Sequence, residues 1–165
     1  KPRCGECPLA ARCGAQKTQR TAELPRRAPP KTIPTVSWVA VRIDRRAALL
    51  LVRRPLSGLW GGLWEFPSGE AGQGEILAEA AARIVYERTG LVPRGIEAIT
   101  TFDHVLSHVR LRIHVFSAGA KGRLILDEYE AADWLTRSQV ATRGVAAWMQ
   151  PLLSVPPHQS RRPSA

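Results

Sequence analysis

Two apolar runs separated by three charged residues constrain the fold of this chain most strongly. The runs read WVAVRI and ALLLV, and the residues between them include Asp44, Arg45 and Arg46. Apolar runs of this length joined by a polar turn are typical of two paired β-strands. The pattern therefore predicts a β-hairpin over residues 38–54.

A helix and further strands are predicted after this hairpin. Ile76, Ala80 and Ile84 recur at four-residue steps, which predicts a helix over residues 76–88, and Gly90 is placed as its C-terminal stop. The later strands are expected at residues 96–101, 109–116 and 124–126, with a turn over 118–122 and one or two short helices in 137–153. Strands that surround a helix in mixed order indicate an α+β fold (an α/β sandwich), with a mixed β-sheet flanked by helices.

The positive charge of the chain gathers at its N-terminal end. The chain has a formal net charge of +10, and residues 1–31 hold eight basic residues against two acidic ones. We expect a cysteine-rich segment at 1–16, a basic, Pro-rich and semi-extended linker at 17–35, a compact domain at 36–153 and a disordered tail at 154–165. A basic arm of this kind suits contact with nucleic-acid phosphates, although a solvated basic linker explains the same composition.

The start of the chain points to a longer parent protein. Met149 is the only methionine, and the chain opens at Lys1 without a signal-peptide pattern. We therefore expect the chain to be the distal piece of a longer protein. No apolar run is long enough to span a membrane, and we expect a cytoplasmic, DNA-associated monomer.

Three cysteines are the sharpest local signal for a bound metal. Cys4, Cys7 and Cys13 follow the spacing C-x2-C-x5-C, which is close enough for their thiolates to converge on one centre. Three ligands are one too few, so a fourth would lie before Lys1. A zinc site and an iron–sulfur cluster both fit, three free thiols are the alternative, and a disulfide framework suits an odd number of cysteines poorly.

The segment KPRCGECPLAARCGA resembles the iron–sulfur loop that closes the catalytic domain of MutY-type adenine DNA glycosylases, whose pattern is C-x6-C-x2-C-x5-C. The similarity continues through RRPLSGLWGGLWEFPSGE and HVLSHVRLRIHVF, so that it spans residues 1–153. The resemblance implies that Cys4, Cys7 and Cys13 are three of the four ligands of a 4Fe-4S cluster that is incomplete in this chain. It also implies a Nudix-like C-terminal domain that recognises 8-oxoguanine opposite adenine in duplex DNA. The family's catalytic acids belong to an absent helical domain, so no residue here is expected to be catalytic.

The Nudix hydrolase pattern, G-x5-E-x7-R-E-U-x-E-E-x-G-U with U a bulky aliphatic residue, fits this chain without a gap. Its scaffold positions are matched by Gly69, Glu75, Arg83, Gly90 and Leu91. Its three clustered carboxylates fall on Ile84, Glu87 and Arg88, so only one of them is acidic. Because hydrolysis in this fold needs acidic oxygens to hold magnesium, we expect structural roles for Glu75 and Arg83. An active Nudix hydrolase of oxidised nucleotides and a non-catalytic protein-interaction module, binding a partner through the linker, are the alternative functions.

The resemblance also assigns the DNA-contacting residues. The family meets 8-oxoguanine with a Phe-Ser-His loop, which corresponds here to Leu106, Ser107 and His108. On the strand that follows, alternation places Arg110 and Arg112 on a polar face. No acid occurs between Asp103 and Asp127, so we expect this face to approach phosphates without repulsion. The residues expected to contact the DNA backbone are Lys1, Arg3, Arg12, Arg110 and Arg112.

Aromatic residues in the GLWGGLWEFP segment invite a base-stacking interpretation. We favour core packing for Trp60, Trp64 and Phe66, because glycines beside bulky side chains suit a tightly packed strand and turn. His104 and His114 are likewise expected to be structural.

Overall fold

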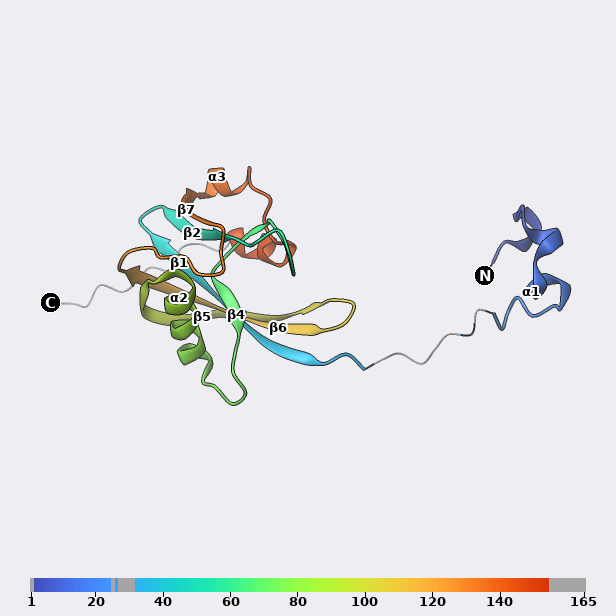
Figure 1. The fold of residues 1–165 in the computed structure, drawn as a ribbon, viewed down its shortest axis with the longest axis horizontal. Helices are drawn as coiled ribbons and strands as arrows, with labels where there is room; N and C mark the ends of the chain where they lie inside the picture. The colour runs from blue at the N-terminus through green and yellow to red at the C-terminus, as the bar shows by residue number, and fades with distance from the viewer. Residues whose placement is uncertain (1, 25, 27–31, 155–165) are drawn as a thin grey trace. The chain divides into compact units, whose positions relative to one another are not determined.

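The structure is a computed structural model that describes residues 2–24, 26 and 32–154 of the chain. It divides into two compact units, residues 1–32 and 33–165 (Figure 1). The predicted tail lies outside the described residues except for Ser154. Within the described ranges, no helix is both long enough and apolar enough to cross a membrane.

The N-terminal unit is built from short helical turns. They are η1 (Cys4–Glu6), η2 (Ala10–Arg12) and α1 (Gly14–Lys17). The chain remains hydrogen-bonded after α1, because Arg20 N donates to Ala15 O at 2.8 Å and Leu24 N donates to Arg20 O at 3.1 Å. The first part of the predicted linker is therefore folded into this unit rather than extended. No proline occurs before Pro25 in that stretch, so its backbone amides are free to form these bonds.

The C-terminal unit contains one mixed sheet, which confirms the predicted fold class. Its strands are β1 (Thr35–Arg45), β2 (Ala48–Arg53), β3 (Trp64–Glu65), β4 (Ser68–Glu70), β5 (Val92–Val105), β6 (Arg110–Lys121) and β7 (Ala131–Thr136). The strand order is β3-β2-β1-β6-β5, with β4 paired to β1 and β7 paired to β2. Strands β1 and β6 are parallel, whereas β1 and β2 form the predicted antiparallel hairpin. The start of β1 at Thr35 lies within the predicted linker.

Helix α2 (Leu77–Thr89) covers one face of the sheet, as the apolar spacing predicts. Its buried residues Ala80, Ala81, Ile84 and Val85 form a stripe that packs with Val39, Val41 and Ile43 of β1. We call this the smaller core cluster. The helix ends at Gly90, which adopts a left-handed conformation with φ 68° and donates its N–H to Tyr86 O at 2.8 Å. The predicted C-terminal stop is thus confirmed.

The opposite face of the sheet is covered by the C-terminal turns α3 (Arg137–Val140) and η3 (Ala147–Ser154). Side chains from these turns pack with β1, β2 and β6 to form the larger core cluster, whose fully buried members include Phe66, Ile113 and Met149. Trp64 is also buried, and Trp60 lies 6.0 Å from Trp148 between ring centroids. The core-packing interpretation of the GLWGGLWEFP segment is confirmed for Trp64 and Phe66.

Two local predictions after residue 117 are wrong. Residues 118–121 continue β6 instead of forming a turn, because Lys121 pairs with Val92 at the start of β5. Residues 124–126 form no strand, because Ile125 N donates to Thr89 O at 2.9 Å and so caps α2 instead of pairing with a strand. The strand in this region is β7, which begins at Ala131 and pairs with β2.

Candidate functional site

Glu75 and Arg83, the two polar scaffold positions of the Nudix pattern, bind each other. The Arg83 Nε and Nη2 atoms donate to the two Glu75 carboxylate oxygens at 2.8 Å each, and Glu75 Oε2 also accepts from Gly72 N at 2.6 Å. These bonds, with Arg83 as the largest cause, lower the pKa of Glu75 to about 2. Arg83 Nη1 also donates to Glu87 at 3.0 Å. The pair fastens the loop before α2 to the helix, as the structural interpretation expected.

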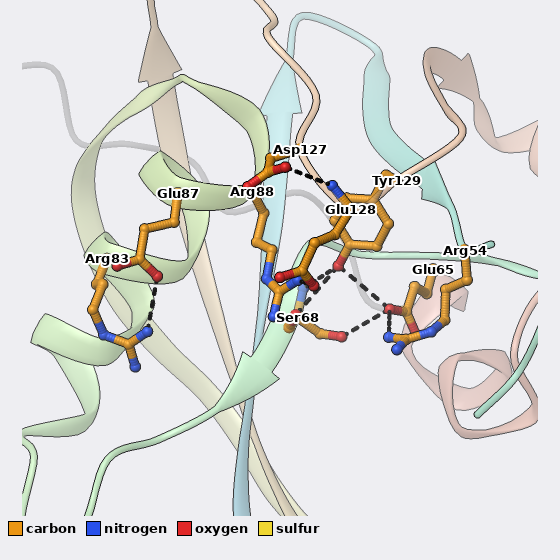
Figure 2. A network of polar contacts seen from close by, with 9 residues as sticks. All are labelled: Arg54, Glu65, Ser68, Arg83, Glu87, Arg88, Asp127, Glu128 and Tyr129. Carbon is orange, nitrogen blue, oxygen red and sulfur yellow. Dashed lines mark hydrogen bonds and ion pairs between the residues drawn. The ribbon is translucent and has the colours of Figure 1, made fainter. Parts of the chain in front are cut away.

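Ile84 and Arg88 occupy the two carboxylate positions of the pattern that are not acidic here. The first packs in the core and the second forms an ion pair within the domain. The Ile84 side chain is buried in the smaller core cluster, against Gly69. Arg88 forms an ion pair with Glu128, from the segment that follows β6 (Figure 2). Glu87, the one surviving carboxylate, is held by Arg83. Within the described parts of the chain, no three His, Cys, Asp or Glu side chains are placed to hold a metal ion together.

A buried polar network lies beside this helix. Glu65 is fully buried, and its Oε1 accepts from Arg54 Nη1 at 2.7 Å and from Ser68 Oγ at 2.9 Å (Figure 2). Tyr129 OH lies 3.5 Å from the same oxygen and accepts from Ser68 N at 3.1 Å. Burial raises the pKa of Glu65, against the opposing effect of Arg54, and raises the pKa of Tyr129 to about 12. The network ties the segment that carries Glu128 to strands β3 and β4.

Sequence reasoning missed this network. The available signal was a glutamate inside the apolar LWEFP segment, since a charged residue in a buried strand requires a partner. Two of its partners, however, lie 11 and 64 positions away along the chain. Nothing in the sequence singles out Glu128 either. Its left-handed backbone, with φ 50°, is visible only in the structure.

The predicted recognition trio lies at the tip of the β5–β6 hairpin. Leu106 N donates to Val109 O at 2.9 Å, which closes the turn. Leu106 is half-buried against the larger core cluster, whereas Ser107 and His108 are exposed and their Oγ and Nδ1 atoms lie 3.4 Å apart. The structure thus presents two of the three predicted residues at the tip and turns the third toward the core.

The expectation that the adjacent cationic face has no acidic neighbour is wrong. Asp103, on β5, pairs in register with Arg112 on β6. Arg112 Nε donates to Asp103 Oδ1 at 3.1 Å, and Arg110 Nη1 lies 3.6 Å from Asp103 Oδ2. The acid was overlooked because strand pairing, and not sequence separation, brings it beside the arginines.

The three cysteines line one pocket of the N-terminal unit. The pocket has a volume of about 300 Å³ and is also lined by Pro2, Arg3, Ala15, Thr21 and Leu24. The thiols are free, with Cys4 and Cys13 half-buried and Cys7 exposed. The three cysteines thus share a pocket, although they are not among any described group of three side chains placed to hold one metal ion.

The basic residues predicted to contact DNA in this unit are exposed. Arg3 forms an exposed ion pair with Glu6 at 3.4 Å, and Arg12 ends η2. Lys1 lies outside the described residues.

Comparison with known proteins places most of the chain in one family. Residues 38–155 match the model of the NUDIX domain. The human adenine DNA glycosylase is 32% identical over 120 residues, which cover 71% of this chain but 22% of that protein. The chain therefore spans about a fifth of the length of the adenine DNA glycosylases that it matches.

A pyrophosphohydrolase and two solved structures are also similar to this chain. The CTP pyrophosphohydrolase of Escherichia coli is 30% identical over 125 residues, which cover 72% of this chain and 88% of that enzyme. The solution structure of the E. coli ORF135 protein superimposes with a TM-score of 0.64 at 26% identity, covering 76% of this chain and 91% of that one. The MutT protein of Methanosarcina mazei has a TM-score of 0.66 at 23% identity, covering 75% and 94% of the two chains, and shows the shared fold.

Proposed function

The chain belongs to the NUDIX domain family, and we propose that it is the C-terminal lesion-recognition part of an adenine DNA glycosylase. In this proposal the chain recognises 8-oxoguanine opposite adenine and contacts the surrounding duplex. A separate catalytic domain of the parent protein would remove the mispaired adenine. The similarity to the adenine DNA glycosylases and the exposed serine–histidine tip support the proposal.

The absence of a free carboxylate cluster at the Nudix positions is the observation that favours lesion recognition over nucleotide hydrolysis. Magnesium in a Nudix hydrolase needs a cluster of free carboxylate oxygens against the phosphates. Here Ile84 is buried in the core, Arg88 places a cation in the helix, and the nearby carboxylates of Glu75, Glu87 and Glu128 are each bound by an arginine. The residues that would hold a magnesium ion are instead used to hold the fold together.

The chemistry of the lesion suits the hairpin tip. Guanine offers N7 as an acceptor, whereas 8-oxoguanine carries a proton on N7 and a new oxygen at C8. The Ser107 hydroxyl both donates and accepts, so it can satisfy this altered edge. His108 is placed to add a donor or to contact a phosphate, and its Nδ1 lies within 3.4 Å of Ser107 Oγ.

Lesion preference tests the proposal directly. The chain is titrated into two labelled duplexes that differ only in carrying an 8-oxoguanine·adenine or a guanine·adenine pair. Tighter binding to the lesion duplex, by about fivefold or more, is expected from one well-formed contact to a base edge. Equal affinity for the two duplexes contradicts the proposal.

We predict that the chain does not hydrolyse nucleotides. Incubation with 8-oxo-dGTP, dGTP or CTP and magnesium should release no phosphate or pyrophosphate above a buffer blank, because the carboxylates that would bind the metal are absent or paired. Colorimetric phosphate detection after pyrophosphatase treatment makes the measurement, with an active MutT-type hydrolase as the positive control. Turnover that disappears on Glu87→Gln would instead support the hydrolase alternative.

We further propose that Cys4, Cys7 and Cys13 hold three corners of a 4Fe-4S cluster in the intact parent. The fourth thiolate would lie seven positions before Cys4, by the resemblance to the glycosylase loop. When bound, such a cluster supplies a rigid covalent cross-link between segments. The chain's own contribution is three thiols at the C-x2-C-x5-C spacing, all of which line one pocket of about 300 Å³.

Adding the missing ligand should restore cluster binding. The chain alone is expected to bind iron and sulfide weakly, and an N-terminal extension with a cysteine seven positions before Cys4 should produce strong visible absorbance after anaerobic reconstitution. The same extension with serine at that position is the matched control. Equal iron content in the cysteine and serine versions would contradict the ligand assignment.

A further inference from the structure

The exposed face of the β5–β6 hairpin holds a three-residue ion-pair cluster of Asp103, Arg110 and Arg112. Asp103 lies opposite Arg112 in register, and one carboxylate contacts both guanidinium groups, at 3.1 Å to Arg112 and 3.6 Å to Arg110. The side chains are 33%, 46% and 53% exposed, in the order Asp103, Arg110 and Arg112. A single acid therefore holds two accessible cations in place.

This cluster lies on an uncovered part of the sheet. Along the neighbouring strand β1, Thr35 pairs with Arg110 and Ser37 pairs with Arg112, and both β1 residues are exposed. Helix α2 packs over the next part of β1, around Val39 and Val41. In Figure 1 the β5–β6 hairpin projects beyond α2. The result is a polar surface that carries two arginines and ends at the Ser107–His108 tip.

The Asp103 carboxylate occupies a position beside two guanidinium groups that a phosphate could also take. A carboxylate and a phosphate both present oxygens to a guanidinium, and arginine binds either one. Arg112 donates directly to Asp103, and this contact, with the charge of Arg110, lowers the pKa of Asp103. The carboxylate is thus ionised at neutral pH and competes with any anion for the same donors.

Solvent weakens the hold of Asp103 on the two arginines, and so limits how strongly it competes with a phosphate. Exposed ion pairs contribute little, since water and salt screen them. A DNA phosphate delivered beside the lesion contact can therefore replace Asp103, whereas an isolated phosphate gains little by doing so. The carboxylate that is displaced stays near the phosphate and opposes it.

We infer that Asp103 is an intramolecular phosphate substitute that restrains the general DNA affinity of the Arg110–Arg112 surface. This inference rests on the proposed function of the chain in DNA recognition. Asp103 keeps the guanidinium groups in a phosphate-binding arrangement and removes part of their attraction for undamaged duplex. Asp103 is thus a positioning residue that limits general DNA affinity and touches neither the base nor the reacting atoms.

Asp103→Asn tests this inference in the 165-residue chain. The variant should bind an undamaged duplex about three- to tenfold more tightly at ~0.1 M salt, and its plot of log affinity against log salt should steepen by about one. Its affinity for the lesion duplex should rise by a similar factor, because phosphate contacts are common to both duplexes. Asp133→Asn is the matched control, because Asp133 forms a similarly exposed pair with Arg143 at 3.6 Å on β7 and its loss changes the net charge equally.

Two further outcomes separate this inference from the proposed function. In a chain that also carries Arg110→Ala and Arg112→Ala, Asp103→Asn should change affinity no more than Asp133→Asn does. If Asp103→Asn and Asp133→Asn have equal effects in the otherwise unchanged chain, a general charge effect explains both and the inference fails. The unchanged chain could show no lesion preference while Asp103→Asn still strengthens duplex binding more than Asp133→Asn does. In that case the proposed lesion function fails and the phosphate-substitute role stands. Thermal melting of each variant verifies that the fold is intact.

Discussion

Arg54→Ala is expected to lower the free energy of unfolding by about 3–5 kcal/mol, since it removes the partner of a buried charge. Glu65 is fully buried and Arg54 is its only cationic partner among the described residues, at 2.7 Å. The other carboxylate oxygen, Oε2, is already buried without a partner in the described part of the chain. The variant would therefore leave an uncompensated carboxylate buried in the fold. Urea denaturation at pH 7 measures the change.

The pH dependence of this variant identifies the cause. Burial raises the pKa of Glu65 in the folded state, and Arg54 opposes that rise. A carboxyl group with a raised folded pKa contributes stability that is fully present below its unfolded pKa and is lost as the pH rises through the folded value. Removing Arg54 raises the folded pKa further, so the deficit of Arg54→Ala should be larger at pH 7 than at pH 5.

Arg53→Ala provides the matched control for this prediction. Arg53 is the adjacent residue and pairs with Glu130 at 3.0 Å, with both side chains about a third or more exposed. Loss of such a pair is expected to cost less than about 1 kcal/mol, with little dependence on pH between 5 and 7. Equal deficits for the two variants, or a deficit of Arg54→Ala that is independent of pH, would contradict a buried-charge role for Glu65.

The sequence allowed the regular elements to be predicted where a local pattern determines them. The β1–β2 hairpin follows from two apolar runs around a charged turn, and α2 follows from a four-residue apolar period closed by Gly90. The segment after residue 117 was mispredicted because its structure depends on partners elsewhere. Residues 118–121 extend β6 only because β5 begins at Val92, and Ile125 serves as a cap for α2.

In the candidate site, too, the features that lie within one short segment could be predicted, and those that depend on distant residues could not. The degenerate Nudix positions and the hairpin tip were readable from residue order, because each lies within one short segment. The pairing of Asp103 with Arg112 was not, since the predicted strand stopped at residue 101, whereas β5 continues to the turn that Leu106 and Val109 close and so brings Asp103 into register with Arg112. The Glu65 network likewise needed Tyr129 from a distant loop.

Ser107→Ala is expected to reduce the preference for 8-oxoguanine over guanine by about five- to 150-fold, which corresponds to the ~1–3 kcal/mol of a good base-edge contact. The substitution removes a hydroxyl at the exposed tip and leaves the turn bond between Leu106 and Val109 in place. Arg110→Ala is the comparison, because it removes a cation next to the tip. It should weaken binding to both duplexes similarly and make the salt dependence shallower by about one.

The ratio of the dissociation constants for the guanine·adenine and 8-oxoguanine·adenine duplexes tests the central claim most directly. We expect this ratio to be well above one for the unchanged chain, to approach one for Ser107→Ala and to stay near its original value for Arg110→Ala. A ratio that Ser107→Ala leaves unchanged, or that Arg110→Ala alone abolishes, would contradict lesion recognition by the hairpin tip and would indicate a nonspecific DNA clamp.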